Sequence, residues 1–343
     1  MKTLDKLSVP VIQGGMGVGI SMGNLAGHVA KEGGMGVIST ASIGFREPDF
    51  WEEPLEAGKR ALAAEIKKAK EISEGNGMVA INAMVATTHF EEMVRVACEN
   101  GIDAIICGAG LPLSLPGIVG DTDVLIAPIV SSGKAVRTIM RYWDRNYGRK
   151  LDFIVVEGHR AGGHLGFSYE EAEKAAGEPL DQIVRDVTGI ADVPVIAAGS
   201  VFGIEEVRSV KEAGAWGIQI ATPFIATEEC DASRRFKDVI ISGSEEDVTI
   251  IKSPVGMPGR ALKTPLVERT QRGERVPPKK CLQCIKTCKP AETPFCINQA
   301  LINGFYGKYE EGLFFCGANV GNVNEMTNVK AVMEKTVKKW EKI

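Results

Sequence analysis

The chain has 343 residues and a formal net charge of −4, with 44% hydrophobic and 24% charged residues. This length suits one large α/β domain or two smaller ones, and the weak negative charge excludes a general attraction to nucleic acid or anionic membranes. Because no apolar run approaches the ~18 residues of a membrane span and residues 1–6 lack a signal-peptide core, we expect a cytoplasmic protein.

Residues 9–222 repeat one pattern, in which a short β-branched apolar run is followed by a glycine-rich or polar loop and then by an amphipathic helix. Eight strands are predicted at 9–16, 35–40, 78–84, 103–107, 123–130, 152–156, 193–200 and 216–222. The ranges 9–16 and 193–200 each include the loop that follows the strand. Helices are predicted at 24–32, 55–74, 90–99, 132–147, 180–190 and 204–213. This alternation favours an α/β fold, the parallel (β/α)8 or TIM barrel.

A doubly wound open sheet is the alternative arrangement. Its dinucleotide-binding form needs a defined glycine spacing in the first loop and an acidic residue at the end of the second strand. Here the first loop has glycines at 14, 15, 17 and 19, which is a poor match, and the second strand ends in Ser39-Thr40. We therefore favour the barrel.

In a parallel barrel the carboxyl ends of all strands meet on one face, where ligand sites collect. The predicted strand ends carry small or polar residues, at 13–16, 82, 108–110, 131–132, 199–200 and 219–222. Such a face suits a flat, polar ligand. The last two loops, Gly199-Ser200 and Ala221-Thr222, precede helices and would offer N–H donors to a phosphate. The alternative is that small residues only let helices pack on strands.

The sixth predicted strand leads into residues 157–166, a loop with four glycines and two histidines, His159 and His164. Glycines allow close approach of the backbone to a ligand, and a histidine can move a proton near neutral pH. The loop therefore predicts a cofactor site, with a solvated glycine turn as the alternative.

The alternation of strands and helices stops after residue 244. We therefore predict a barrel domain at 1–244 and an extension at 245–343 that folds over the barrel mouth. Residues 253–260 are predicted to form a loop, and 328–342 a final helix. Four of the eight cysteines cluster in this extension: Cys281, Cys284, Cys288 and Cys296. In a cytoplasmic protein this spacing favours one soft metal centre, a [4Fe–4S] cluster or zinc, over disulfides. A packed lid with reduced thiols is the alternative.

Five segments resemble the nitronate monooxygenase family, formerly called 2-nitropropane dioxygenases, and the related flavin-dependent enoyl-acyl-carrier-protein reductases. They are PVIQGGM at 10–16, GAGLP at 108–112, AGGHLG at 161–166, PVIAAG at 194–199 and GIQ at 217–219. The match is collinear over about residues 9–230. The resemblance implies a TIM barrel with non-covalent FMN and a histidine that faces the flavin.

Carried over by position, the resemblance implies that His164 is the catalytic histidine. It implies flavin contacts at Gly14, Gly15, Met16, Asn82, Glu157 and Gly162, and a phosphate end at Gly199, Ser200, Gln219, Ile220, Ala221 and Thr222.

Three positions depart from the family pattern. Arg160 stands where the family usually has an acidic residue, Ser200 replaces a glycine, and residues 221–224 lack an arginine. Because a serine can still donate to a phosphate, we expect FMN binding to persist. The arginine changes put the substrate preference in doubt.

Two activities follow from the resemblance. A nitronate monooxygenase would oxidise alkyl nitronates with O2 to a carbonyl compound and nitrite, whereas an enoyl reductase would use NAD(P)H to reduce an enoyl thioester. A non-redox barrel, such as an isomerase, or a flavin-binding sensor is a third class; only Glu157 would serve an isomerase as a strand-end carboxylate. The partners expected are a small-molecule substrate, with a homodimer as one option for assembly.

Overall fold

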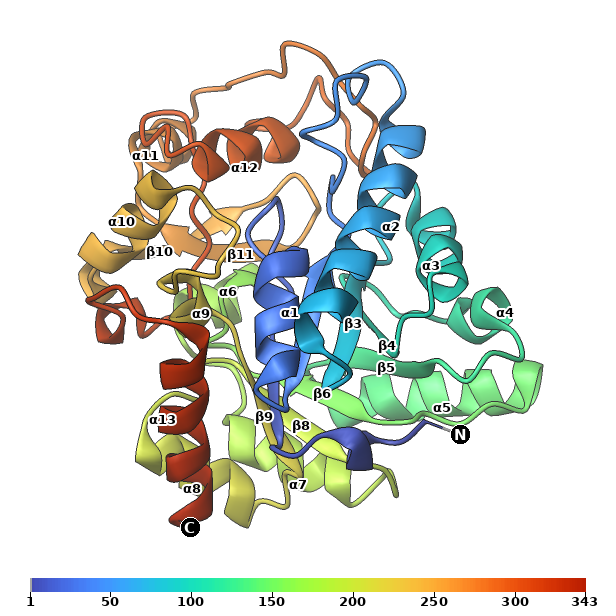
Figure 1. Cartoon of the computed structure of the whole chain (residues 1–343). Helices are drawn as coiled ribbons and strands as arrows, with labels where there is room; N and C mark the ends of the chain where they lie inside the picture. Colours follow the sequence, from blue (N-terminus) through green and yellow to red (C-terminus); the bar gives the residue numbers. More distant parts are fainter. Residues whose placement is uncertain (1) are drawn as a thin grey trace.

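The computed structural model describes residues 2–343 and contains a closed barrel of parallel strands in the order β1-β2-β3-β4-β5-β6-β8-β9. The strands are β1 (Val11–Gln13), β2 (Met35–Ser39), β3 (Met78–Met84), β4 (Ala104–Gly108), β5 (Leu125–Val130), β6 (Ile154–Glu157), β8 (Val195–Ala198) and β9 (Gly217–Ile220). Pairing of Ile12 with Gln219 closes the barrel between β1 and β9. The predicted TIM barrel is confirmed, and the open sheet is excluded (Figure 1).

The strands are apolar along their whole length because both of their faces are covered. On β2, Val37 belongs to the cluster that fills the barrel, whereas its neighbour Ile38 belongs to the cluster under the outer helices. Successive side chains of a strand point to opposite faces, so a continuous apolar run supplies both cores at once. Leu4 and Leu7 close the barrel at its amino-terminal end.

An outer ring of helices covers the barrel (Figure 1). Its members are α1 (Gly23–Lys31), α2 (Pro54–Ser73), α3 (Phe90–Glu99), α4 (Leu115–Val119), α5 (Gly133–Tyr147), α7 (Leu180–Thr188) and α8 (Ile204–Glu212). The C-terminal helix α13 (Val329–Glu341) packs against both α8 and α1. Lys211 of α8 fixes it by donating to the carbonyl of Trp340 at 2.7 Å. The last helix therefore completes the ring on the outside of the barrel.

The connection after β9 contains the short helix α9 (Thr222–Ile225), α10 (Arg234–Ser242) and the 3-10 helix η2 (Glu245–Asp247) before the chain turns back over the barrel. There β10 (Val248–Lys252) and β11 (Pro258–Leu262) form an antiparallel hairpin, and β7 (Gly163–His164) joins its edge. Helices α6 (Tyr169–Glu173), α11 (Pro265–Gln271) and α12 (Ile297–Phe305) complete this region.

The loop predicted at 253–260 is partly wrong, because residues 258–260 belong to β11. Pro258 and two glycines suggested a loop from composition. Pro258 is, however, the first residue of its strand, where a proline is tolerated. Only 253–257 form a tight turn, closed by the N–H of Ser253 donating to the carbonyl of Met257 at 3.2 Å.

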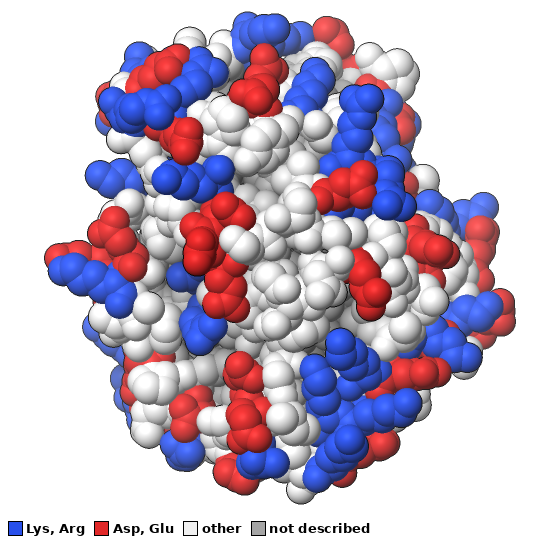
Figure 2. Space-filling model, turned by 90° about the vertical axis from the view of Figure 1, so that its left-hand side faces the viewer, with Lys and Arg blue, Asp and Glu red and all other residues white. Residues whose placement is uncertain are grey.

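The surface mixes both signs of charge. Figure 2 shows acidic and basic side chains interspersed around an uncharged area on the face turned to the viewer. Within residues 2–343, no helix has both the length and the apolarity that crossing a membrane requires.

Candidate functional site

A cavity of about 410 Å³ opens at the carboxyl ends of the barrel strands, within the usual size range of ligand pockets. Every residue that the sequence assigned to catalysis or to the flavin lines it: Gly14, Gly15, Met16, Asn82, Glu157, Gly162, His164, Gly199, Ser200, Gln219, Ile220, Ala221 and Thr222. The structure thus brings these residues together, and their individual roles stay predictions.

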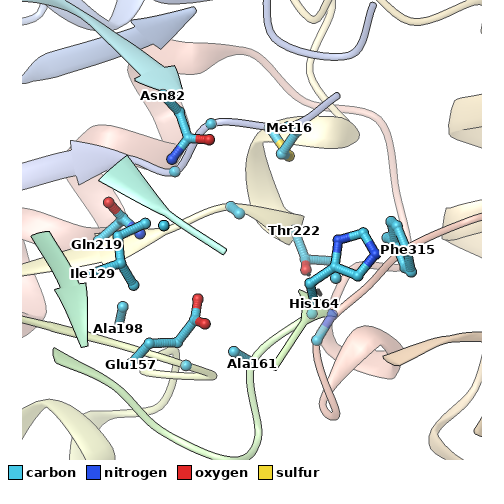
Figure 3. Close-up of a pocket in the computed structure, with 18 of the residues that line it drawn as sticks. Met16, Asn82, Ile129, Glu157, Ala161, His164, Ala198, Gln219, Thr222 and Phe315 are labelled. Carbon is cyan, nitrogen blue, oxygen red and sulfur yellow. Dashed lines mark hydrogen bonds between the residues drawn. The ribbon is translucent and has the colours of Figure 1, made fainter. Parts of the chain in front are cut away.

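His164 reaches the cavity from β7, the strand that pairs with the hairpin. Its Nε2 lies 2.7 Å from the hydroxyl oxygen of Ser253. Its ring meets Phe315 edge-on, with centroids 5.1 Å apart (Figure 3). Burial lowers the pKa of His164 to about 4, so the imidazole is neutral at pH 7. A neutral imidazole can donate one hydrogen bond and accept another.

Ser253 orients this imidazole, and the sequence did not predict it. Its hydroxyl oxygen accepts the N–H of Val255 at 3.3 Å and can donate its own proton to Nε2 of His164. In that arrangement Nδ1 carries the ring proton. A serine in a turn 89 residues away gives no local signal of such a contact.

Three polar side chains enter the cavity from separate strands: Asn82 from β3, Glu157 from β6 and Gln219 from β9 (Figure 3). Among residues 2–343, none of the three side chains has a hydrogen-bond partner. Gly15 allows Asn82 its position, because a Cβ at residue 15 would lie 2.3 Å from the Cβ of Asn82. The three groups are therefore available to the polar edge of a ligand.

Burial raises the pKa of Glu157 to about 8, so the carboxyl group is protonated at pH 7. A protonated carboxyl donates a hydrogen bond, which an ionised one cannot do.

The raised pKa predicts that Glu157→Gln gains stability relative to the wild type as the pH rises from about 4.5 to about 8. In this window the unfolded carboxyl is ionised and the folded one is protonated. The free energy of unfolding of the wild type therefore falls, by about 1.4 kcal/mol per pH unit for one group. Urea unfolding of flavin-free wild type and variant from about pH 4 to pH 9 measures the difference. A difference that stays constant with pH would contradict a protonated Glu157.

The end of the cavity near Gly199 offers backbone donors. Gly199 and Ser200 have φ values of +103° and +67°, which turn the chain sharply after β8. The Ser200 hydroxyl donates to the carbonyl of Arg160 at 2.7 Å and is thereby directed away from a phosphate. The backbone N–H groups of Ser200 and Val201 have no acceptor among residues 2–343, which leaves them for an anion.

Residues 315–319 complete the cavity wall, and sequence reasoning missed them. Gly317 donates its N–H to the hydroxyl oxygen of Thr222 at 3.0 Å, and Asn319 donates from Nδ2 to the carbonyl of Ser200 at 3.3 Å. Gly162 is required here, because a Cβ would lie 2.4 Å from the carbonyl carbon of Cys316. In the sequence, only Gly317 and Asn319 after Cys316 could have indicated that this segment lines a ligand site.

Arg260, which is only 6% exposed, holds the loop at 158–162, before His164, in place. Its guanidinium donates to the carbonyls of His159 at 2.5 Å, Ala161 at 2.9 Å and Ala172 at 3.4 Å. The side chain of Arg160, in contrast, is exposed and lies outside the cavity lining, so this departure from the family pattern adds no charge to the pocket.

The cysteine cluster lines a different cavity, of about 560 Å³, to which Cys281, Cys284, Cys288 and Cys296 all contribute. Within residues 2–343, no three histidine, cysteine, aspartate or glutamate side chains lie close enough together to hold a metal ion. The predicted metal centre at these four cysteines, a [4Fe–4S] cluster or zinc, therefore stays a prediction.

The first cavity fits FMN. The amide and carboxyl groups of Asn82, Gln219 and Glu157, unpaired among residues 2–343, line the cavity, and the N–H groups of Ser200 and Val201 lie without an acceptor in that range at the turn after β8. Backbone N–H groups before a helix are a common phosphate site of barrel enzymes, and α8 begins at Ile204.

Comparisons with known proteins identify the family and the fold. The family model of nitronate monooxygenase matches residues 1–339. The FabK structure from Thermotoga maritima has a TM-score of 0.76 at 22% identity, covering 100% of this chain and 97% of that chain. A nitroalkane oxidase from Streptomyces ansochromogenes has a TM-score of 0.76 at 16% identity, covering 98% and 97%. At such identities these structures support the fold alone.

Curated relatives match over shorter stretches. A (3aS,4S,5R,7aS)-5-hydroxy-7a-methyl-1-oxo-octahydro-1H-indene-4-carboxyl-CoA dehydrogenase of Mycobacterium tuberculosis is 24% identical over 266 residues, which are 78% of this chain and 66% of that protein. A probable nitronate monooxygenase of Staphylococcus aureus is 29% identical over 124 residues, 36% of this chain and 35% of the relative. The matches thus span less than two thirds of these relatives. Because the family model covers almost the whole chain, the protein belongs to the nitronate monooxygenase family of flavin-dependent oxidoreductases.

Proposed function

We propose that the protein is an FMN-dependent oxidoreductase that oxidises alkyl nitronates with O2 to a carbonyl compound and nitrite. The observation that carries the proposal is a neutral, serine-oriented His164 at the wall of a strand-end cavity. In the same cavity the side chains of Asn82, Glu157 and Gln219 have no hydrogen-bond partner among residues 2–343. FMN, when bound, supplies the group that accepts the electrons of the substrate.

The protein's own residues position the reactants. Asn82, Gln219 and Glu157 would hold the polar edge of the flavin ring, and the N–H groups of Ser200 and Val201 its phosphate. Nδ1–H of His164 would donate to a nitronate oxygen. With a neutral nitroalkane, the imidazole would instead accept the proton from carbon, which requires the other tautomer and rotation of the Ser253 hydroxyl.

An enoyl-thioester reductase that uses NAD(P)H is the second candidate, and one observation favours it. A small apolar cavity of about 90 Å³ adjoins the strand-end cavity proposed to hold FMN, which we call the flavin cavity. The two cavities share His164, Met84 and Leu301. Its other walls include Phe50 and Met93. Such a space would accept the alkyl chain of an acyl thioester, which a short nitronate does not need.

Visible spectra of anaerobically purified protein test the two activities. An alkyl nitronate is added to one cuvette; NADH or NADPH is added to another, followed by a short enoyl thioester. Bleaching of the flavin by nitronate alone, with nitrite released once O2 is admitted, is the result expected. Bleaching only by NAD(P)H, with recovery on addition of the thioester, would establish the second candidate. Absence of flavin would contradict both.

A further inference from the structure

The cysteine cavity is a built pocket and not a loose surface loop. Its cysteines lie on a segment pinned to the barrel, because the N–H of Thr88 donates to the carbonyl of Cys284 and that of Lys286 to the carbonyl of Ala86, both at 3.0 Å. Cys281 is exposed, whereas Cys284, Cys288 and Cys296 are half-buried. The barrel side contributes Trp51 to the wall.

The two candidate metal centres place their thiolates differently. Four thiolates around zinc each lie about 2.3 Å from one point, so their sulfurs are only about 3.8 Å apart. No group of this kind exists among residues 2–343. In a [4Fe–4S] cluster each thiolate binds a different iron, so the four sulfurs surround the cluster and stand further apart. Four thiols that line one cavity of about 560 Å³, with no group among residues 2–343 that could hold a single metal ion, match the second arrangement.

Asn298 provides an independent observation. Its side chain lines the cysteine cavity, is only 4% exposed, and has no hydrogen-bond partner at either Nδ2 or Oδ1 among residues 2–343. A buried amide without a partner costs on the order of 1–3 kcal/mol. A sulfur acceptor inside the cavity would satisfy Nδ2.

One backbone donor already reaches a cysteine sulfur. The N–H of Gln283 donates to Sγ of Cys281 at 3.4 Å. Cys296 is the N-cap residue of α12, and its sulfur lies near the backbone N–H groups of Asn298 and Gln299 without a cap hydrogen bond. Lys280 and Lys286 add positive charge to the cavity lining, although Lys280 also pairs with Glu52 at 3.1 Å. N–H···S hydrogen bonds and nearby charge are the features by which proteins stabilise and tune iron–sulfur clusters.

We propose that Cys281, Cys284, Cys288 and Cys296 bind one [4Fe–4S] cluster, with Nδ2 of Asn298 donating to a cluster or cysteinyl sulfur. The small apolar cavity next to the flavin cavity is lined by both His164 and Cys284. The cluster would therefore lie one layer of side chains away from the flavin cavity. The proposal is independent of which substrate the flavin site takes.

The test is metal analysis of the full-length holoprotein, purified anaerobically or reconstituted with ferrous iron and sulfide. We expect about four iron and four acid-labile sulfide per chain, with an electron paramagnetic resonance signal after dithionite reduction. Cys284→Ser should lose most of the iron and this signal while retaining flavin. Cys98→Ser is the matched control, because Cys98 lies on α3 outside the cavity, and it should keep both.

Stoichiometric zinc, or folded protein that binds flavin but neither iron nor sulfide, would overturn the proposal. If Cys284→Ser does not fold, Asn298→Leu is the second variant. It should keep the cluster but shift its reduction potential downward, since a donor to the negatively charged reduced cluster is lost. An unchanged potential would contradict the role of Asn298.

Discussion

Replacing His164 by asparagine is expected to lower kcat/KM for an alkyl nitronate by about 10²–10⁴-fold, the usual contribution of a positioned proton-transfer group. Asparagine keeps a polar side chain of similar size, but it cannot exchange a proton at neutral pH. FMN should remain bound, because the flavin is expected to be held by Asn82, Glu157 and the turn after β8. Nitrite release and flavin content, measured on the same preparation, separate loss of catalysis from loss of cofactor.

His159→Asn is the matched control, because it is the other histidine of the same loop. Its ring packs edge-on against Phe167 and lies outside the cavity lining. We expect this variant to retain activity within a few-fold of the wild type. Equal losses in the two variants would mean that the loop conformation, and not a group at residue 164, controls the rate. Ser253→Ala should show a smaller loss than His164→Asn, since it only frees the imidazole to turn.

Replacing Arg260 by methionine is expected to destabilise the protein by on the order of 3 kcal/mol and to weaken FMN binding. Methionine has a similar length but leaves two loop carbonyls and the carbonyl of Ala172 in α6 without their donor, and unpaired buried groups cost about 1–3 kcal/mol each. Relief from burying the guanidinium charge offsets part of this sum. The loop released by this substitution includes Ala161 and leads directly to His164. FMN binding would then have to order this loop, and the lost conformational entropy would weaken the affinity for FMN. Urea unfolding and the flavin retained after gel filtration measure the two effects.

Two further variants test whether the effect of Arg260→Met comes from the lost hydrogen bonds of this guanidinium. Arg260→Lys keeps the charge but not the forked donor geometry, so an intermediate loss is expected. Arg272→Met removes an arginine of the same region whose side chain is 68% exposed, and its effect should stay within about 0.5 kcal/mol. If Arg260→Met unfolds like the wild type and retains flavin, then other contacts hold the loop.

The sequence determined the barrel and the composition of its open end. Strand and helix periodicity is a local property, and parallel strands of a barrel bring their carboxyl ends to one face whatever the details of packing. For this reason Asn82, Glu157 and Gln219, which lie far apart in the chain, could be placed around one cavity before the structure was known. Their expected roles came from the family resemblance, which the family model confirms for the chain as a whole.

Only the tertiary structure decided which distant residues complete the site. Ser253 contacts His164 across 89 residues and Arg260 reaches Ala161 across 99, and no periodicity of either segment encodes such a contact. The protonation of Glu157 and His164 depends on burial, which long-range packing creates. Likewise, the cysteine spacing predicted a metal centre without choosing between zinc and a cluster. That all four thiols line one cavity is a property of the folded chain alone, because it depends on how residues 281–296 are held against the barrel.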